Sequence, residues 1–303
     1  MADLTGLKSN LAMRARVIDA IRGFFRSEGF LEVETPVRVR TPAPESNIDA
    51  IPSDGWFLST SPELYMKQML AAGYERLVQI TRCFRLGERG RLHNPEFTML
   101  EWYRAGADYL EILADSERLV EQVCRQVGRW PVVRYQGLEL DMRAPWKRMK
   151  VLDAFEAFAG WRPGSDPDPD RFDIDLVEKV EPAIGRQAPI CLLDYPAAMA
   201  SLARLKQGAE VAERLEVYAG GLELANAYSE LNDPEEQRRR FIGENEKRRK
   251  AGKQVYPLPE RFLSVVGRMP SAGGCALGID RLVMLLCDAA SIDEVVAFTS
   301  DTA

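Results

Sequence analysis

Apolar positions follow helical spacing in some segments of the chain and strand-like alternation in others. Residues 11–28 repeat apolar side chains every three or four positions, which predicts an amphipathic helix, and Gly29 is a suitable residue to end it. The same spacing predicts helices over 60–72, 109–128, 145–160 and 234–251. The helix at 60–72 opens with Thr-Ser-Pro-Glu, so Thr60 and Glu63 form a predicted capping box.

Runs of β-branched and aromatic residues predict the strands. They occur at 30–36, at 190–195 and on both sides of an arginine-rich loop within 82–104. We predict a β-hairpin at 211–231, a strand that passes through Gly278 into a helix at 275–286, and an exposed loop at 162–170. Strands and helices do not alternate regularly, which favours an α+β fold with an antiparallel sheet. There is no internal repeat or long linker, so residues 1–303 are expected to form a single domain.

The composition is that of an ordinary soluble protein, with 46% hydrophobic and 28% charged residues. No apolar stretch approaches the roughly 20 residues that cross a bilayer. The first residues also lack the layout of a signal peptide, so we expect a cytoplasmic protein with no membrane partner. The net charge of −6 argues against a broad phosphate-binding face. Residues 237–250 are interpreted as a solvated helix of mixed charge, with a local basic patch as the alternative.

Several kinds of site are disfavoured. Five dispersed cysteines and one histidine, His93, argue against a zinc site and against Ser-His-Asp or Cys-His catalysis, unless His93 is itself the base. Neither a P-loop nor a strand-placed G-x-G-x-x-G motif is present. A nucleotide would therefore need another kind of site.

The arginine-rich loop offers one. Arg85, together with Arg89 or Arg91, could bind a phosphate through two parallel hydrogen bonds, and Phe97 offers an aromatic face to a purine. A surface hairpin with ordinary charges is the structural alternative.

A second candidate site is the hairpin at 211–231. A turn at 219–220 would pair Glu216 directly with Glu223, and a turn at 220–221 would place them diagonally on one face. Like charges so placed are unfavourable unless a cation lies between them, and two carboxylates suit Mg²⁺. Two solvated glutamates on an edge strand are the alternative.

Residues 82–104 resemble motif 2 of the class II aminoacyl-tRNA synthetases. His-Asn-Pro-Glu-Phe-Thr-Met-Leu-Glu at 93–101 resembles the lysyl branch of that family. Residues 273–286 resemble motif 3, with a buried glycine-rich turn as the structural alternative, and 30–36 resemble motif 1, a dimer-interface element in the family. The resemblance covers almost the whole chain. It implies an antiparallel sheet flanked by helices, and a homodimer.

The resemblance also implies residue roles around ATP and Mg²⁺. Arg85 and Arg281 would be the catalytic residues, and Glu216 and Glu223 the metal ligands. Further nucleotide contacts would come from Gly87, Glu88, Asn94, Phe97, Leu224 and Gly278, as well as from Glu223. The amino acid would be bound by Ser61, Pro62, Glu63, Glu101, Tyr103, Asn226, Glu230 and Ala276. Strict alternation puts Glu223 and Glu230 on opposite faces, so a bulge is expected between them, near 225–227.

Two positions depart from the lysyl pattern. Gly87 stands where the family has a glutamate, so either Glu88 contacts the nucleotide after a small backbone shift or that contact is lost. Ala276 replaces a glycine of motif 3, and its methyl group would crowd an α-amino group and favour a β-amino acid by ~1–3 kcal/mol.

Motif 1 begins about thirty residues into the chain, which leaves no room for the anticodon-binding domain of lysyl synthetases. The resemblance therefore implies a paralogue that activates β-lysine, with lysine as a weaker substrate, and attaches it to a lysine of translation elongation factor P. On this reading tRNA is not a partner. The alternatives are a truncated synthetase that charges tRNA and an inactive synthetase-like regulator.

Overall fold

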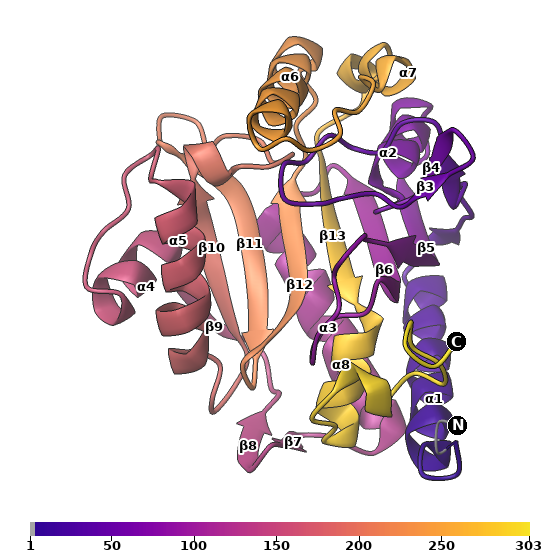
Figure 1. Ribbon diagram of the computed structural model, residues 1–303. Coiled ribbons are helices and arrows are strands. Elements are labelled where there is room, and N and C mark those ends of the chain that lie inside the picture. The colour runs from indigo at the N-terminus through magenta and orange to yellow at the C-terminus, as the bar shows by residue number, and fades with distance from the viewer. Residues whose placement is uncertain (1–3) are drawn as a thin grey trace.

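A computed structural model describes residues 4–303. Its centre is an eight-stranded sheet in the order β1-β5-β6-β13-β12-β11-β10-β9 (Figure 1). Neighbouring strands are antiparallel except at the two edges, where β1 is parallel to β5 and β9 is parallel to β10. The predicted α+β fold with a mainly antiparallel sheet is confirmed.

The strands of the central sheet are β1 (Leu31–Glu32), β5 (Arg76–Phe84), β6 (Glu96–Ala105), β9 (Lys147–Lys150), β10 (Ile190–Pro196), β11 (Val211–Ala219), β12 (Leu222–Ser229) and β13 (Ala272–Gly278). Two small sheets contain β2 (Arg38–Val39), β3 (Pro52–Ser53) and β4 (Trp56–Leu58), and β7 (Val132–Tyr135) and β8 (Leu138–Asp141). The α-helices are α1 (Lys8–Ser27), α2 (Glu63–Ala71), α3 (Tyr109–Val127), α4 (Val151–Phe158), α5 (Pro169–Asp175), α6 (Pro234–Lys250), α7 (Glu260–Leu263) and α8 (Ile279–Cys287). No helix within residues 4–303 combines the length and apolarity needed to cross a membrane.

One face of the sheet is covered by α1, α3 and α8. Leu100 and Trp102 of β6 and Leu277 of β13 pack into the same buried cluster as these helices. Since side chains alternate along a strand, the residues between them point to the opposite face, where the polar side chains gather. In Figure 1, α6 and α7 lie beyond one end of the sheet, and α4 and α5 lie beside β10.

Two local predictions are wrong. The Thr60–Glu63 capping box does not form, because Pro62 is the N-cap of α2 and the Oγ atom of Ser61 accepts the Glu63 N–H at 3.0 Å. The helix expected over 145–160 is preceded by β9, because Lys147–Lys150 pairs in parallel with β10 at the sheet edge. Pairing with a distant strand overrides the local helical pattern there.

The β11–β12 hairpin turns at Gly220 and Gly221, which both have positive φ (62° and 78°), as a two-residue turn of this type requires. Glu223 pairs with Tyr218 and therefore lies diagonally from Glu216 on the same face. The ladder then skips Leu224, so that Val217 pairs with Ala225. The expected bulge is present, one residue earlier than predicted.

Candidate active site

A cavity of about 960 Å³ lies on the face of the sheet opposite α1, α3 and α8. Its floor comes from alternate residues of β6, β12 and β13, and its walls from the loop at 44–48, the start of α2, the segment 197–202 and α6. The candidate residues in its wall are Ser61, Glu63, Arg85, Glu88, Asn94, Phe97, Glu101, Tyr103, Glu223, Leu224, Asn226, Glu230, Ala276, Gly278 and Arg281. Pro62, Gly87 and Glu216 are not among them.

Two guanidinium groups lie at one end of this cavity. Nη1 of Arg281 donates to the carbonyl oxygen of Glu223 at 2.9 Å and to its Oε2 atom at 3.0 Å. The Arg85 guanidinium lies 5.1 Å from the centre of the Phe97 ring and 3.8 Å from the Glu88 carboxylate. The Nε atom of Arg85 is buried and has no hydrogen-bond partner among the described residues. This end of the cavity can therefore bind an anion.

His93 supports Arg281. Its Nε2 atom lies 2.6 Å from Nη2 of Arg281. Burial, then Arg281, then Arg85 lower the pKa of His93. The imidazole is therefore neutral at physiological pH, and its Nε2 atom accepts a hydrogen bond from the Arg281 guanidinium, which holds Arg281 in place.

The other two arginines of the loop point elsewhere. Arg89 forms ion pairs with Asp293 at 2.9 Å and Asp301 at 2.6 Å, and Arg91 donates to the carbonyl oxygen of Ala290 at 3.0 Å. Neither lines the cavity. Arg89 and Arg91 were the two arginines expected to act with Arg85, and the structure brings neither to the site. Glu88, the candidate to replace the glutamate missing at Gly87, does line the cavity.

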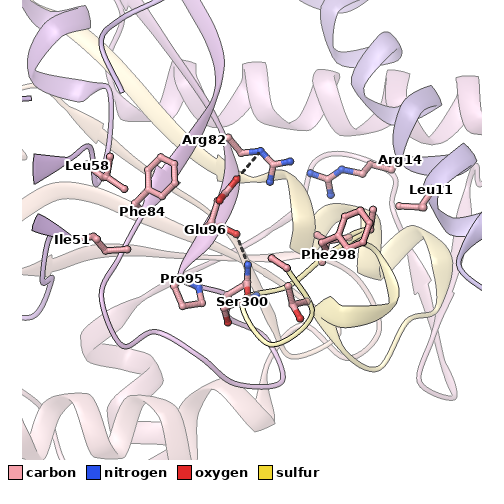
Figure 2. Close-up of a pocket in the computed structure, with 15 residues that line it drawn as sticks. Leu11, Arg14, Ile51, Leu58, Arg82, Phe84, Pro95, Glu96, Phe298 and Ser300 are labelled. Atoms are coloured by element: carbon pink, nitrogen blue, oxygen red, sulfur yellow. Dashed lines mark hydrogen bonds and ion pairs between the residues drawn. The ribbon is translucent and has the colours of Figure 1, made fainter. Parts of the chain in front are cut away.

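Asn94 separates the cavity from a second pocket, of about 630 Å³, between α1, the β5–β6 hairpin and the C-terminal segment. Figure 2 shows that pocket, with Arg82 and Glu96 on one side and Phe298 on another. The Asn94 side chain donates to the Glu96 carbonyl at 2.6 Å and accepts from the Ser300 N–H at 3.2 Å. Its amide thus joins the arginine loop to the C-terminal segment.

Glu216 lies beside the cavity under a cover of side chains. Its Oε2 accepts hydrogen bonds from Tyr195 and Tyr218, both at 2.5 Å, and its Oε1 accepts from Arg214 at 2.6 Å. Burial and then Glu216 raise the pKa of Glu223, so the two carboxylates interact. Within residues 4–303, no group of three or more acidic, histidine or cysteine side chains is arranged to hold a metal ion. A metal here would need further ligands from a bound molecule.

The opposite end of the cavity is acidic. Glu101 is 1% exposed and accepts from Ser61 at 2.6 Å and from Tyr103 at 2.7 Å. Burial, with a contribution from Glu63, raises the pKa of Glu101 to about 8. Glu230, also 1% exposed, completes a group of three carboxylates. Such a group can bind amines.

The floor between the two ends is built from small residues. Ala276 pairs with Asn226 on one side and with Glu101 on the other, so its methyl group lies between an amide and a carboxylate. The Oδ1 atom of Asn226 is buried and has no hydrogen-bond partner within the described chain. It is therefore available to a ligand.

Residues 4–302 match the model of a family described as tRNA synthetases class II (D, K and N). The chain belongs to this family.

Two groups of class II relatives are similar to the chain. It is 35% identical over 320 residues to the lysine–tRNA ligase of Carboxydothermus hydrogenoformans, covering 96% of this chain and 65% of that protein. It thus spans about two thirds of the length of such lysine–tRNA ligases. It is 39% identical over 315 residues to the elongation factor P–(R)-β-lysine ligase of Salmonella gallinarum, covering 97% of this chain and 96% of that protein. The corresponding ligase of Edwardsiella ictaluri is 37% identical over 314 residues, with the same coverage.

Two basic residues at this class II site were not predicted from the sequence. Lys67 contacts Glu63 and Glu230, and Arg214 contacts Glu216. A signal existed for Lys67, which follows Glu63 by one helical turn. Helix α6 has the expected mixed charge, since Arg240 pairs with Glu236 and Lys247 with Glu244. It is not fully solvated, because it buries Phe241 and Arg248 and forms one wall of the cavity.

Proposed function

We propose that this protein uses ATP to activate β-lysine, with lysine as a weaker substrate, and transfers the aminoacyl group to a lysine ε-amine of translation elongation factor P. The observation that carries the proposal is the polarity of the cavity. Arg85 and Arg281 lie at one end, Glu63, Glu101 and Glu230 lie at the other, and the same three strands form the floor between them.

The first step is the attack of the amino-acid carboxylate on the α-phosphorus of ATP, with release of pyrophosphate. The carboxylate is already ionised, so no base is required. Arg85 stabilises the charge that develops on the α-phosphate, and Arg281 binds the terminal phosphate. Phe97 offers a face to adenine once ATP displaces the Arg85 guanidinium from the ring. The acidic end holds the two amines of the substrate and so orients its carboxylate.

Mg²⁺ fits this site through Glu223, which lines the cavity, and through Glu216 only if Tyr195, Tyr218 or Arg214 releases one of its oxygen atoms. Both offer hard oxygen atoms. Burial first, and then the charge of Glu216, raises the pKa of Glu223, and a cation between the two carboxylates would offset both effects. Magnesium commonly binds through one or two carboxylates together with phosphate oxygens, which agrees with the small number of protein ligands here. When bound, the ion would neutralise phosphate charge.

In the second step the acceptor amine attacks the carbonyl carbon of the mixed anhydride. An amide bond forms, the bond to phosphate breaks, and AMP leaves. The assignment of the acceptor rests on the names of relatives that match this chain from end to end, such as the β-lysine ligase of Erwinia tasmaniensis (38% identical, 95% of that protein covered). The match to lysine–tRNA ligases favours tRNA charging as the second candidate function.

We further propose a cytoplasmic homodimer in which residues 1–303 form one catalytic domain. Apolar Leu31 lies within the segment that resembles motif 1 and Val37 directly follows it. They are 50% and 46% exposed, which supports self-association. Light scattering after size-exclusion chromatography tests whether the protein is a dimer. A monomer at micromolar concentration would contradict the proposed homodimer.

Amino-acid-dependent exchange of pyrophosphate into ATP tests the activation step. We expect exchange with both amino acids and a higher kcat/KM with β-lysine. Incubation with elongation factor P, followed by mass spectrometry, should show one added aminoacyl group, and incubation with tRNA should show no charging. No exchange with either amino acid would overturn the proposal in favour of an inactive regulator, whereas charged tRNA with unmodified elongation factor P would replace it with the second candidate.

A further inference from the structure

The acidic end of the cavity contains a buried cation. Lys67 of α2 is 0% exposed, and its Nζ atom lies 2.5 Å from Oε1 of Glu63 and 2.5 Å from Oε2 of Glu230. Lys67 does not line the cavity, but both of its partners do. The ammonium group thus joins the first turn of α2 to the end of β12 from behind the cavity wall.

The bridge leaves one oxygen of Glu230 without a partner. Oε1 of Glu230 is buried and has no hydrogen-bond partner among residues 4–303. A methyl group at Gly274 would overlap this oxygen and the ring of Tyr103, so a glycine is needed there to leave room for both. An unpaired buried carboxylate oxygen is costly unless a ligand donates to it.

The formal charges fit a substrate with two amines. Burial raises the pKa of Glu101 to about 8, so this carboxyl ionises near neutral pH only when a cation binds beside it. With Glu63, Glu101 and Glu230 ionised in that state and Lys67 protonated, this end of the site carries a formal charge of −2. Two ammonium groups would neutralise it. Without Lys67 the three carboxylates would face one another without a resident cation, and burial would favour protonating one of them.

Resting on the proposed function, we infer that Lys67 is a positioning and specificity-determining residue. It holds the Glu63 and Glu230 carboxylates at the spacing that a diamino acid requires. Its positive charge also sets the net charge of this end of the cavity. It acts through these two glutamates without touching the substrate.

The neighbouring ionisable groups agree with this role. Burial raises the pKa of Glu230, and Lys67 opposes that shift. Burial opposes the charge of Lys67, but Glu230 and Glu63 outweigh it and raise the pKa of Lys67. The β6 groups at this end of the cavity are Glu101 and Tyr103, which are hydrogen-bonded to each other, and neither carries a positive charge. On α6, Arg240 donates to the carbonyl oxygens of Ser201 and Ala203. Lys67 is thus the cation bonded to Glu230 within the described chain.

Lys67→Met tests this inference through pyrophosphate exchange, with KM for the amino acid and for ATP measured separately from about pH 6 to about pH 9. We expect KM for β-lysine to rise about 10- to 100-fold near neutral pH, with KM for ATP nearly unchanged. Removing Lys67 moves the pKa of Glu230 further up, so binding should recover as the pH rises and that carboxyl ionises. The matched control is Lys206→Met, since Lys206 pairs with Asp194 at 3.1 Å outside the cavity wall.

Lys67→Arg keeps the cation and is the second variant. Its KM for β-lysine should show the pH dependence of the wild type. If Lys67→Met does not fold, the pH profile of Lys67→Arg alone tests the inference. A folded Lys67→Met enzyme with the wild-type KM and pH profile would overturn the inference, as would a Lys67→Arg profile displaced toward higher pH. Absence of exchange by the wild-type protein would instead count against the proposed function.

Discussion

The imidazole of His93 accepts a hydrogen bond from the guanidinium of Arg281, with 2.6 Å between the two nitrogens. The two residues come from the arginine loop and from the first turn of α8, and both line the cavity. Since a protonated imidazole could not accept this bond, the contact requires neutral histidine. It links the protonation of one side chain to the placement of a proposed catalytic arginine.

His93 is the only histidine in the chain, so one NMR signal reports its titration. We expect a midpoint well below the ordinary value of 6.5 and a shift back toward it in Arg281→Met. The unfolded chain takes up this proton at higher pH than the folded one, so the contribution to stability is lost as the pH falls below 6.5. A midpoint at or above 6.5 in the folded wild type would contradict this geometry.

Arg85 and Arg89 belong to the same loop but should differ sharply on substitution. Arg85→Ala removes a cavity-facing guanidinium, and we expect pyrophosphate exchange to fall about 100-fold or more, as it does when one transition-state donor is lost. Arg89→Ala removes exposed ion pairs with Asp293 and Asp301 and should change exchange by less than about fivefold. Equal losses would show that the loop rearranges on ATP binding.

Ala276 is expected to affect the choice of amino acid. Ala276→Gly removes the methyl group between Asn226 and Glu101 and should shift the ratio of kcat/KM for lysine over β-lysine upward by about 10- to 200-fold. Ala276→Val should impair both substrates. An unchanged ratio in the glycine variant would remove Ala276 from the specificity site.

Gly274 and Gly278 lie on the same strand and make a matched pair. A methyl group at Gly274 would overlap Glu230 and Tyr103, so Gly274→Ala should lower the free energy of unfolding by about 1–3 kcal/mol and abolish exchange. At Gly278 the nearest atom to a new methyl group is 3.8 Å away, and Gly278→Ala should cost about 1 kcal/mol or less. Thermal unfolding separates the two; a destabilised Gly278→Ala would be the unexpected outcome.

Glu223 should set the requirement for magnesium. We expect Glu223→Gln to raise the Mg²⁺ concentration for half-maximal exchange by about 10-fold or more. Glu213→Gln on the neighbouring strand, where Glu213 pairs with Arg204 at 2.6 Å, is the control. If both variants keep the wild-type magnesium dependence, Glu223 is not a ligand.

Much of the fold could be predicted because its determinants are local. Gly29 ends α1 and Gly220–Gly221 form the hairpin turn through backbone conformations that glycine adopts without strain. The bulge was predictable because the resemblance assigns both Glu223 and Glu230 to the site, and strict alternation would put them on opposite faces. For the helix end and the hairpin turn, residues a few positions apart carried the information.

The errors involve distant partners. The direction of Arg89 depends on Asp293 and Asp301, about two hundred positions later, and no pattern within the loop distinguishes it from Arg85. Lys67 reads as an ordinary solvent-facing lysine of a short helix until Glu230 is placed beside it. Glu216 reads as a free ligand until Tyr195 is brought over it from β10.

The single extra residue at Leu224 has a consequence for how this enzyme could change. Because the ladder skips that position, one strand supplies both Glu223 near the nucleotide and Glu230 near the substrate amine. Deleting Leu224 would restore regular pairing and turn one of these carboxylates into the helix-packed layer. Point substitutions can therefore alter which amino acid is accepted, whereas a one-residue deletion in β12 would separate nucleotide binding from amine recognition altogether.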